Sequence, residues 1–310
     1  MTTAATKDIA LDADAGRSIW SDASRKLRRD PVAVVCFTVI CLYAVIAVVS
    51  PLVLSGWADT YNYEQTNKPP SSDYVLGTDT FGRSVFQETL LATNTSMTVA
   101  FMANVIAVPL GMLLGAIAGY YGGWVDDAII WLFTTLAAVP GIIRMIAIKF
   151  AFLDKVLFEG TPFAINLDGM AGLYIAIGIT SWIGTCRLVR AETMKIRQLD
   201  YCLAARSIGT GRFSTLIRHV LPNVAHIGII NFSLGFQGAI GAEVTLSYLG
   251  LGVKDVPSWG RMIDASKMDL LLGRWWELTA ALVPAFIVIL AWNLFGDRLR
   301  DALDPKLRNA

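Results

Sequence analysis

Six apolar segments of about 20 residues each set the strongest constraint on how this chain can fold. They cover residues 32–54, 97–120, 127–148, 170–189, 224–246 and 279–296. Each is long enough to cross the apolar layer of a membrane as a helix. Only 16% of the residues are charged, against about 25% in soluble domains. We therefore expect an all-α fold, a polytopic membrane bundle of about six transmembrane helices.

The distribution of Lys and Arg predicts the orientation of this bundle. With the N-terminus in the cytoplasm, 17 of the 26 basic residues fall in the N-terminal segment, between the fourth and fifth spans, or in the C-terminal tail. Basic residues concentrate in the cytoplasmic loops of membrane proteins, so both termini are predicted to be cytoplasmic. The predicted units are a cytoplasmic segment 1–31, a first transmembrane helix 32–54, an external loop 55–96, a five-helix core 97–296 with a cytoplasmic loop 190–223, and a cytoplasmic tail 297–310.

The chain lacks the sequence motifs of several kinds of enzymatic chemistry. The chain has no G-x-x-x-x-G-K-[ST] phosphate loop, no H-E-x-x-H and no G-x-S-x-G, which are the patterns typical of nucleotide hydrolysis, zinc proteases and serine hydrolases. Its two histidines and four cysteines form no zinc-type cluster. A net charge of +1 gives no basic field for nucleic acid. We expect no catalytic residue, bound cofactor, metal or nucleic-acid partner in this chain.

Glycines recur at helical spacing in two of the spans. Gly111, Gly115 and Gly119 lie four residues apart, and Gly235, Gly238 and Gly241 lie three apart. Small residues at such spacing let helix backbones approach closely in lipid. We expect tight packing there, within the chain or against a partner.

Residues 187–223 form a long basic segment between two spans. Its apolar spacing predicts a helix up to Ile208, a break at 209–211, a second helix over 212–220, and an end at 221–223, where a proline stands. Two short helices joined by a glycine turn suit docking into a groove of another protein. An amphipathic hairpin lying on anionic lipid headgroups is the alternative.

This segment resembles the coupling motif of binding-protein-dependent ABC import permeases. The resemblance rests on two alanines, a glycine four residues later and a hydrophobic–Pro pair about a dozen residues beyond. In that family the loop inserts into a cleft of the ATPase subunit. Leu203 stands where the family often has Glu, and Asp200 is the nearest acid. The implied coupling residues are Asp200, Leu203, Ala204, Ala205, Gly209, Arg212, Leu221 and Pro222.

Four further stretches resemble one permease subunit of dipeptide and oligopeptide importers. They cover 25–31, 76–83, 246–260 and 293–305, in the family's order. The resemblance implies a type I ABC importer fold in the bacterial cytoplasmic (inner) membrane. It also implies a second homologous permease, one or two ATPase subunits that bind ATP-Mg, an external substrate-binding protein, and lipid around the bundle. Peptides are the expected cargo, and nickel chelates, glutathione or oligosaccharides are the alternatives. A secondary transporter is a weaker alternative.

Four polar residues inside the spans are candidates for the translocation pathway. They are Arg144, Asn231, Gln237 and Glu243. Polar residues in spans often line water or substrate. The alternatives are snorkelling or a structural pair for Arg144, and helix–helix hydrogen bonds for the other three.

Overall fold

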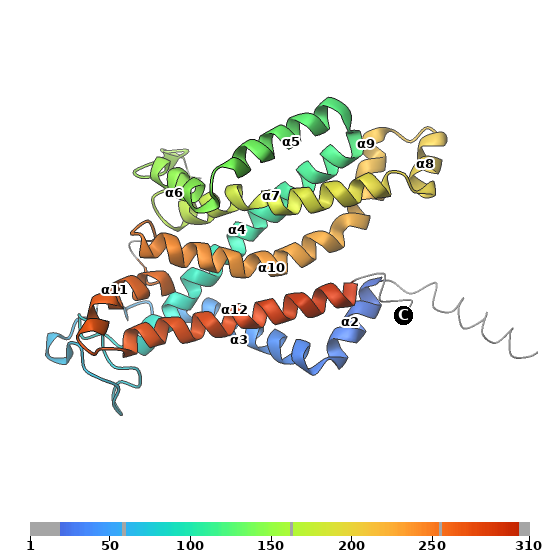
Figure 1. Ribbon diagram of the computed structural model, residues 1–310. Coiled ribbons are helices and arrows are strands. Elements are labelled where there is room, and N and C mark those ends of the chain that lie inside the picture. Colours follow the sequence, from blue (N-terminus) through green and yellow to red (C-terminus); the bar gives the residue numbers. More distant parts are fainter. Residues whose placement is uncertain (1–18, 58–59, 162–163, 254–255, 304–310) are drawn as a thin grey trace, which may run out of the picture.

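The computed structural model describes residues 19–57, 60–161, 164–253 and 256–303, and its long elements are all helices (Figure 1). The helices are α2 (Ile19–Arg29), α3 (Pro31–Val53), α4 (Val85–Tyr121), α5 (Gly123–Ala138), α6 (Gly141–Ala151), α7 (Met170–Ile196), α8 (Asp200–Ser207), α9 (Arg212–Thr215), α10 (Leu221–Tyr248), α11 (Trp259–Leu271) and α12 (Trp276–Leu303). A 3-10 turn at Tyr63–Gln65 and a π-helical turn at Leu216–Val220 are further helical elements of the described residues. Strands β1 (Val156–Leu157) and β2 (Ile165–Asn166) pair antiparallel, with Val156 opposite Asn166.

Five helical runs are long and apolar enough to cross a membrane. They are α3, α4, α7, the run Arg212–Tyr248 and α12. The helices α5 and α6 together make a sixth candidate, but they meet at 91°. The segment predicted as a span over 127–148 is therefore covered by two helices with a sharp bend between them. Pro140 explains the break, because proline favours an extended residue before it, and Val139 has ψ 130°.

The boundaries of two further elements differ from those predicted. Helix α4 begins at Val85, so the external loop predicted over 55–96 ends about a dozen residues early. Asp79 organises the turn before it, because its carboxylate accepts hydrogen bonds from the backbone N–H groups of Phe81 and Arg83, each at 2.8 Å. The carboxylate also pairs with the Arg83 Nε at 2.7 Å. This turn lies directly before Val85, where the external loop ends and α4 begins.

The second boundary concerns Pro222, which does not end a helix. It lies in the first turn of α10, and the helical run continues from Arg212 to Tyr248. Proline has no N–H to donate to the carbonyl four residues earlier. The π-helical turn Leu216–Val220 directly before α10 absorbs this missing bond, so the chain continues as a helix instead of stopping.

The predicted glycine contact is confirmed for α4, which packs along α7. A Cβ added to Gly111, Gly115 or Gly119 would lie 2.5–2.6 Å from a backbone carbonyl oxygen of α7. No side chain fits there, so these glycines set the helix separation. Of the three glycines predicted to pack in α10, Gly235 packs closely, against Asn104, while Gly238 and Gly241 have open space before them.

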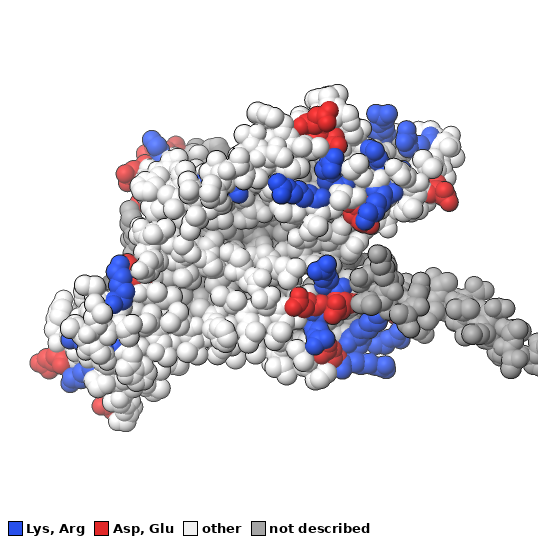
Figure 2. All heavy atoms as spheres, viewed as in Figure 1, with Lys and Arg blue, Asp and Glu red and all other residues white. Residues whose placement is uncertain are grey.

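Charged side chains gather at the two ends of the bundle, and a broad uncharged belt lies between them (Figure 2). Lys and Arg are dense at the end that carries α2, α8 and α9 (Figures 1 and 2). At the other end, Trp259 is fully buried where α3, α4, α10, α11 and α12 contribute to one apolar core. This distribution fits a bundle that crosses an apolar layer.

Candidate functional site

A hairpin of two short helices, residues 199–220, connects α7 to α10 and lies at the basic end of the bundle (Figure 1). Helix α8 ends in a Schellman motif: the Gly209 N–H donates to the Arg206 carbonyl at 3.1 Å, and the Thr210 N–H donates to the Ala205 carbonyl at 3.0 Å. Gly209 has φ +84°, a conformation that L side chains rarely adopt. The glycine break predicted between the two helices is therefore present, and its geometry requires glycine.

One side of the α8–α9 hairpin is buried in the bundle. Cys202, Leu216 and Val220 pack with Tyr120 of α4 and Ile196 of α7 in a shared apolar cluster. Burial also raises the pKa of the Cys202 thiol. Because this cluster joins the hairpin to α4 and α7, a displacement of the hairpin would be passed to both spanning helices.

The other side of the hairpin carries large exposed apolar residues. Leu203 is 46% exposed, Ile208 84% and Phe213 69%. Water-exposed apolar groups of this size in one small element typically mark an interaction surface. The eight predicted coupling residues divide around it: Asp200, Leu203, Ala204, Gly209 and Arg212 are exposed on the hairpin, Ala205 is buried, and Leu221 and Pro222 lie in α10.

A second feature is a cavity of about 420 Å³ between α4, α6, α7 and α10. Its polar groups are amides and hydroxyls, from Asn104, Ser181, Thr185 and Asn231. Glycine and alanine supply much of the remaining wall, and no charged side chain belongs to the lining that the structure describes. An uncharged wall with scattered hydrogen-bonding groups suits a neutral or zwitterionic polar solute better than a fixed ion.

Of the four residues predicted for a pathway, the structure brings only Asn231 to this cavity. Glu243 is fully buried elsewhere in α10, where its carboxylate accepts hydrogen bonds from Ser96 Oγ at 2.9 Å and Ser247 Oγ at 2.7 Å. Arg144 donates to the Leu136 carbonyl across the bend between α5 and α6. Gln237 is half-buried and lies outside the cavity lining.

Sequence reasoning missed Asn104, Ser181 and Thr185. All three are polar residues inside apolar spans, which was the available signal. Uncharged residues of this kind are common in membrane helices, so the signal gained meaning only when the fold placed them around one cavity.

The comparisons with known proteins agree with this architecture. A family model described as "Binding-protein-dependent transport system inner membrane component" matches residues 111–309, more than half of the chain. The chain belongs to this family. It is a multi-pass inner-membrane permease with the type I ABC importer fold, as the resemblance predicted. A second model, "N-terminal TM domain of oligopeptide transport permease C", matches residues 18–70.

Relatives of this permease match it over nearly its whole length. The glutathione transport system permease protein GsiD of Pectobacterium atrosepticum is 34% identical over 94% of this chain and 93% of its own. The dipeptide transport system permease protein DppC of Bacillus subtilis is 33% identical over 94% and 87%. The oligopeptide transport system permease protein OppC of Bacillus subtilis is 32% identical over 94% and 91%.

Proposed function

We propose that this permease forms one wall of the translocation pathway in an ATP-driven importer of peptides. Its α8–α9 hairpin docks on an ATPase subunit, which binds ATP-Mg and hydrolyses it, while this chain does no covalent chemistry. The observation that carries the proposal is the two-sided hairpin. Its exposed apolar side chains, Leu203, Ile208 and Phe213, are available to a partner, and its buried side is packed on α4 and α7.

The basic end of the bundle is proposed to face the cytoplasm, with both termini on that side. The concentration of Lys and Arg around α2, α8 and α9 supports this orientation (Figure 2). The external loop and α11 then face outward, where a substrate-binding protein delivers the cargo. A second permease of the same family completes the pathway, and one or two ATPase subunits energise it.

Peptides are the proposed cargo. The relatives are described as transporters of dipeptides, oligopeptides and glutathione, which is itself a small peptide. The cavity between α4, α6, α7 and α10 offers amides and hydroxyls, and its described lining carries no charge. Such a wall can hydrogen-bond a peptide backbone without selecting for the charge of its side chains.

Reconstitution of the complete importer tests this function. Ile208→Asp places a charge on the exposed apolar surface of the hairpin, and Leu271→Asp makes a matched change at an equally exposed apolar residue (79%) of α11, at the other end of the bundle. We expect Ile208→Asp to abolish copurification of the ATPase and peptide-stimulated ATP hydrolysis, and Leu271→Asp to leave ATPase copurification intact. Normal copurification and hydrolysis with Ile208→Asp would refute the docking role.

A further inference from the structure

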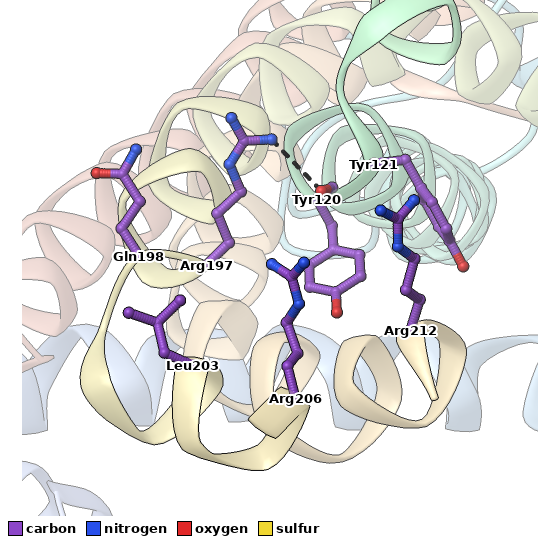
Figure 3. A pocket seen from close by; sticks show the side chains of 7 residues that line it. All are labelled: Tyr120, Tyr121, Arg197, Gln198, Leu203, Arg206 and Arg212. Carbon is purple, nitrogen blue, oxygen red and sulfur yellow. Dashed lines mark hydrogen bonds between the residues drawn. The ribbon is translucent and has the colours of Figure 1, made fainter. Parts of the chain in front are cut away.

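A basic pocket of about 290 Å³ lies between the α8–α9 hairpin and the ends of α4 and α7 (Figure 3). Arg197 follows the last residue of α7, Arg206 lies on α8 and Arg212 begins α9. Tyr120 and Tyr121, the last residues of α4, form the opposite wall. Three guanidinium groups from three segments therefore converge on one hollow.

The pocket carries positive charge that the described residues do not neutralise. No acidic side chain belongs to its described lining. Arg197 donates to the carbonyl oxygens of Gly119 at 2.9 Å and Tyr120 at 3.4 Å, so it is held in place by neutral acceptors. Arg206 and Arg212 are exposed and make no ion pair within the part of the chain that the structure describes. Guanidinium groups in this arrangement are suited to an oxyanion.

Tyr120 supplies an independent sign of a missing ligand. Its side chain is only 8% exposed, yet its hydroxyl has no hydrogen-bond partner among the described residues. The hydroxyl points toward the gap between the Arg206 and Arg212 side chains (Figure 3). Buried polar groups are nearly always paired in folded proteins. An unpaired donor beside two unpaired cations fits an anionic acceptor in this pocket.

The position of the pocket identifies the source of that anion. Tyr120 and Tyr121 end the 37-residue apolar helix α4, and tyrosines concentrate at the membrane–water interface, at the level of the lipid headgroups. Basic pockets between spanning helices on the cytoplasmic side bind anionic headgroups. The pocket opens between the hairpin and the ends of the spanning helices. Of the three exposed apolar residues of the hairpin, Leu203 lines it and Ile208 and Phe213 do not.

We propose that this pocket binds the phosphate group of an anionic phospholipid of the cytoplasmic leaflet. Arg206 and Arg212 pair with the phosphate oxygens, and the Tyr120 hydroxyl donates a hydrogen bond to one of them. The proposal rests on the orientation given under the proposed function. It assigns the two interactions considered for the hairpin to different surfaces: a protein partner contacts Ile208 and Phe213, a lipid headgroup occupies the pocket, and Leu203 lies at the border between the two.

The test measures headgroup binding to the full-length chain purified in detergent. Thermal unfolding is followed during titration with soluble dihexanoyl phosphatidylglycerol, dihexanoyl phosphatidylcholine or inorganic phosphate, all at constant ionic strength. We expect phosphatidylglycerol to raise Tm saturably and the other two to have little effect. If inorganic phosphate raises Tm as much as phosphatidylglycerol does, the ligand is a free anion and the lipid assignment is overturned. A lack of response to all three ligands also overturns it.

Three variants locate the binding site. Arg206→Gln is expected to weaken the phosphatidylglycerol response about tenfold, because one charge-assisted interaction is lost. Tyr120→Phe removes only the hydroxyl, so it keeps the packing of α4 while it weakens the response. Arg218→Gln is the matched control, because Arg218 is an exposed arginine of the same hairpin that does not line the pocket. An equal loss of response in Arg206→Gln and Arg218→Gln, with no loss in Tyr120→Phe, would show general charge attraction and overturn the proposed site.

One further outcome separates this proposal from the proposed function. If phosphatidylglycerol leaves the Tm of the chain unchanged and Arg206→Gln instead reduces ATPase copurification, the pocket belongs to the ATPase contact and the lipid site is refuted. Headgroup binding is measured on the permease alone and ATPase docking on the assembled importer. Each can therefore fail without the other.

Discussion

Arg190 and Asp126 form a bidentate ion pair that joins α7 to α5. The Arg190 Nε lies 2.5 Å from Asp126 Oδ1, and Nη2 lies 2.7 Å from Oδ2. The two side chains are 24% and 13% exposed, so water screens the pair only in part. The backbone carbonyl of Arg190 also abuts Gly119 of α4. One residue thus holds three helices together near the α8–α9 hairpin.

Asp126→Asn should lower the stability of the permease. The substitution removes the charge from a bidentate pair, and hydrogen bonds to charged groups contribute about 1.5–3 kcal/mol. Thermal unfolding in detergent measures the change. Lys267→Gln is the control, because it breaks an exposed ion pair with Asp264 that should contribute less than about 1 kcal/mol. Equal shifts in Tm for the two variants would contradict the structural role of the Arg190–Asp126 pair.

Gly115→Ala should loosen the contact between α4 and α7. The new Cβ would lie 2.5 Å from the Cys186 carbonyl oxygen, which is fixed backbone. Overpacking of this kind costs about 1–3 kcal/mol, so we expect a lower Tm and less protein in the membrane. Gly241→Ala, where nothing lies within 4 Å, should be tolerated. If Gly115→Ala has the same Tm as the unchanged chain, α4 and α7 can move apart without a loss of stability.

Gly238→Phe should block transport while the importer still assembles. Gly238 lines the cavity between α4, α6, α7 and α10 and has no atom within 4 Å of an added Cβ, so the ring would project into free space. We expect peptide uptake into proteoliposomes to be lost and ATPase copurification to be kept. Gly241→Phe, on the same helix but outside the cavity lining, is the control. Normal uptake with Gly238→Phe would exclude this cavity from the pathway.

The Cys202 thiol should resist maleimide across neutral and mildly alkaline pH. Burial disfavours its thiolate and raises its pKa, so at any given pH it has less of the reactive form than an exposed thiol. The engineered thiol of Ile208→Cys, at an 84% exposed position of the same hairpin, is the comparison. Peptide mapping by mass spectrometry should show that labelling of the engineered thiol at position 208 rises steeply toward pH 8.5, while labelling of Cys202 stays low. Equal rates would mean that the hairpin separates from α4 and α7 readily.

The sequence predictions succeeded where a local pattern decides the structure. Five of the spans stand where apolar runs predicted them, the glycine ridge of α4 packs as its spacing indicated, and the break at Gly209 is present. Each depends on the composition or turn chemistry of a short segment. The structure differs from the sequence predictions at prolines and at the ends of helices. Pro140 breaks a span and Pro222 does not end a helix, because neighbouring backbone decides whether a missing N–H is tolerated.

The candidate sites likewise depend partly on local sequence and partly on tertiary structure. Apolar run length and basic charge by themselves determined that the chain is a membrane bundle, and the motif at 204–222 placed the hairpin. Only the tertiary structure decided that Asn104, Ser181, Thr185 and Asn231 share a cavity, that Glu243 is tied to Ser96, and that Arg197, Arg206 and Arg212 converge on Tyr120. Whether these side chains come together depends on the rotation of each helix about its own axis. That rotation is set by how helices pack on one another, which no single segment encodes.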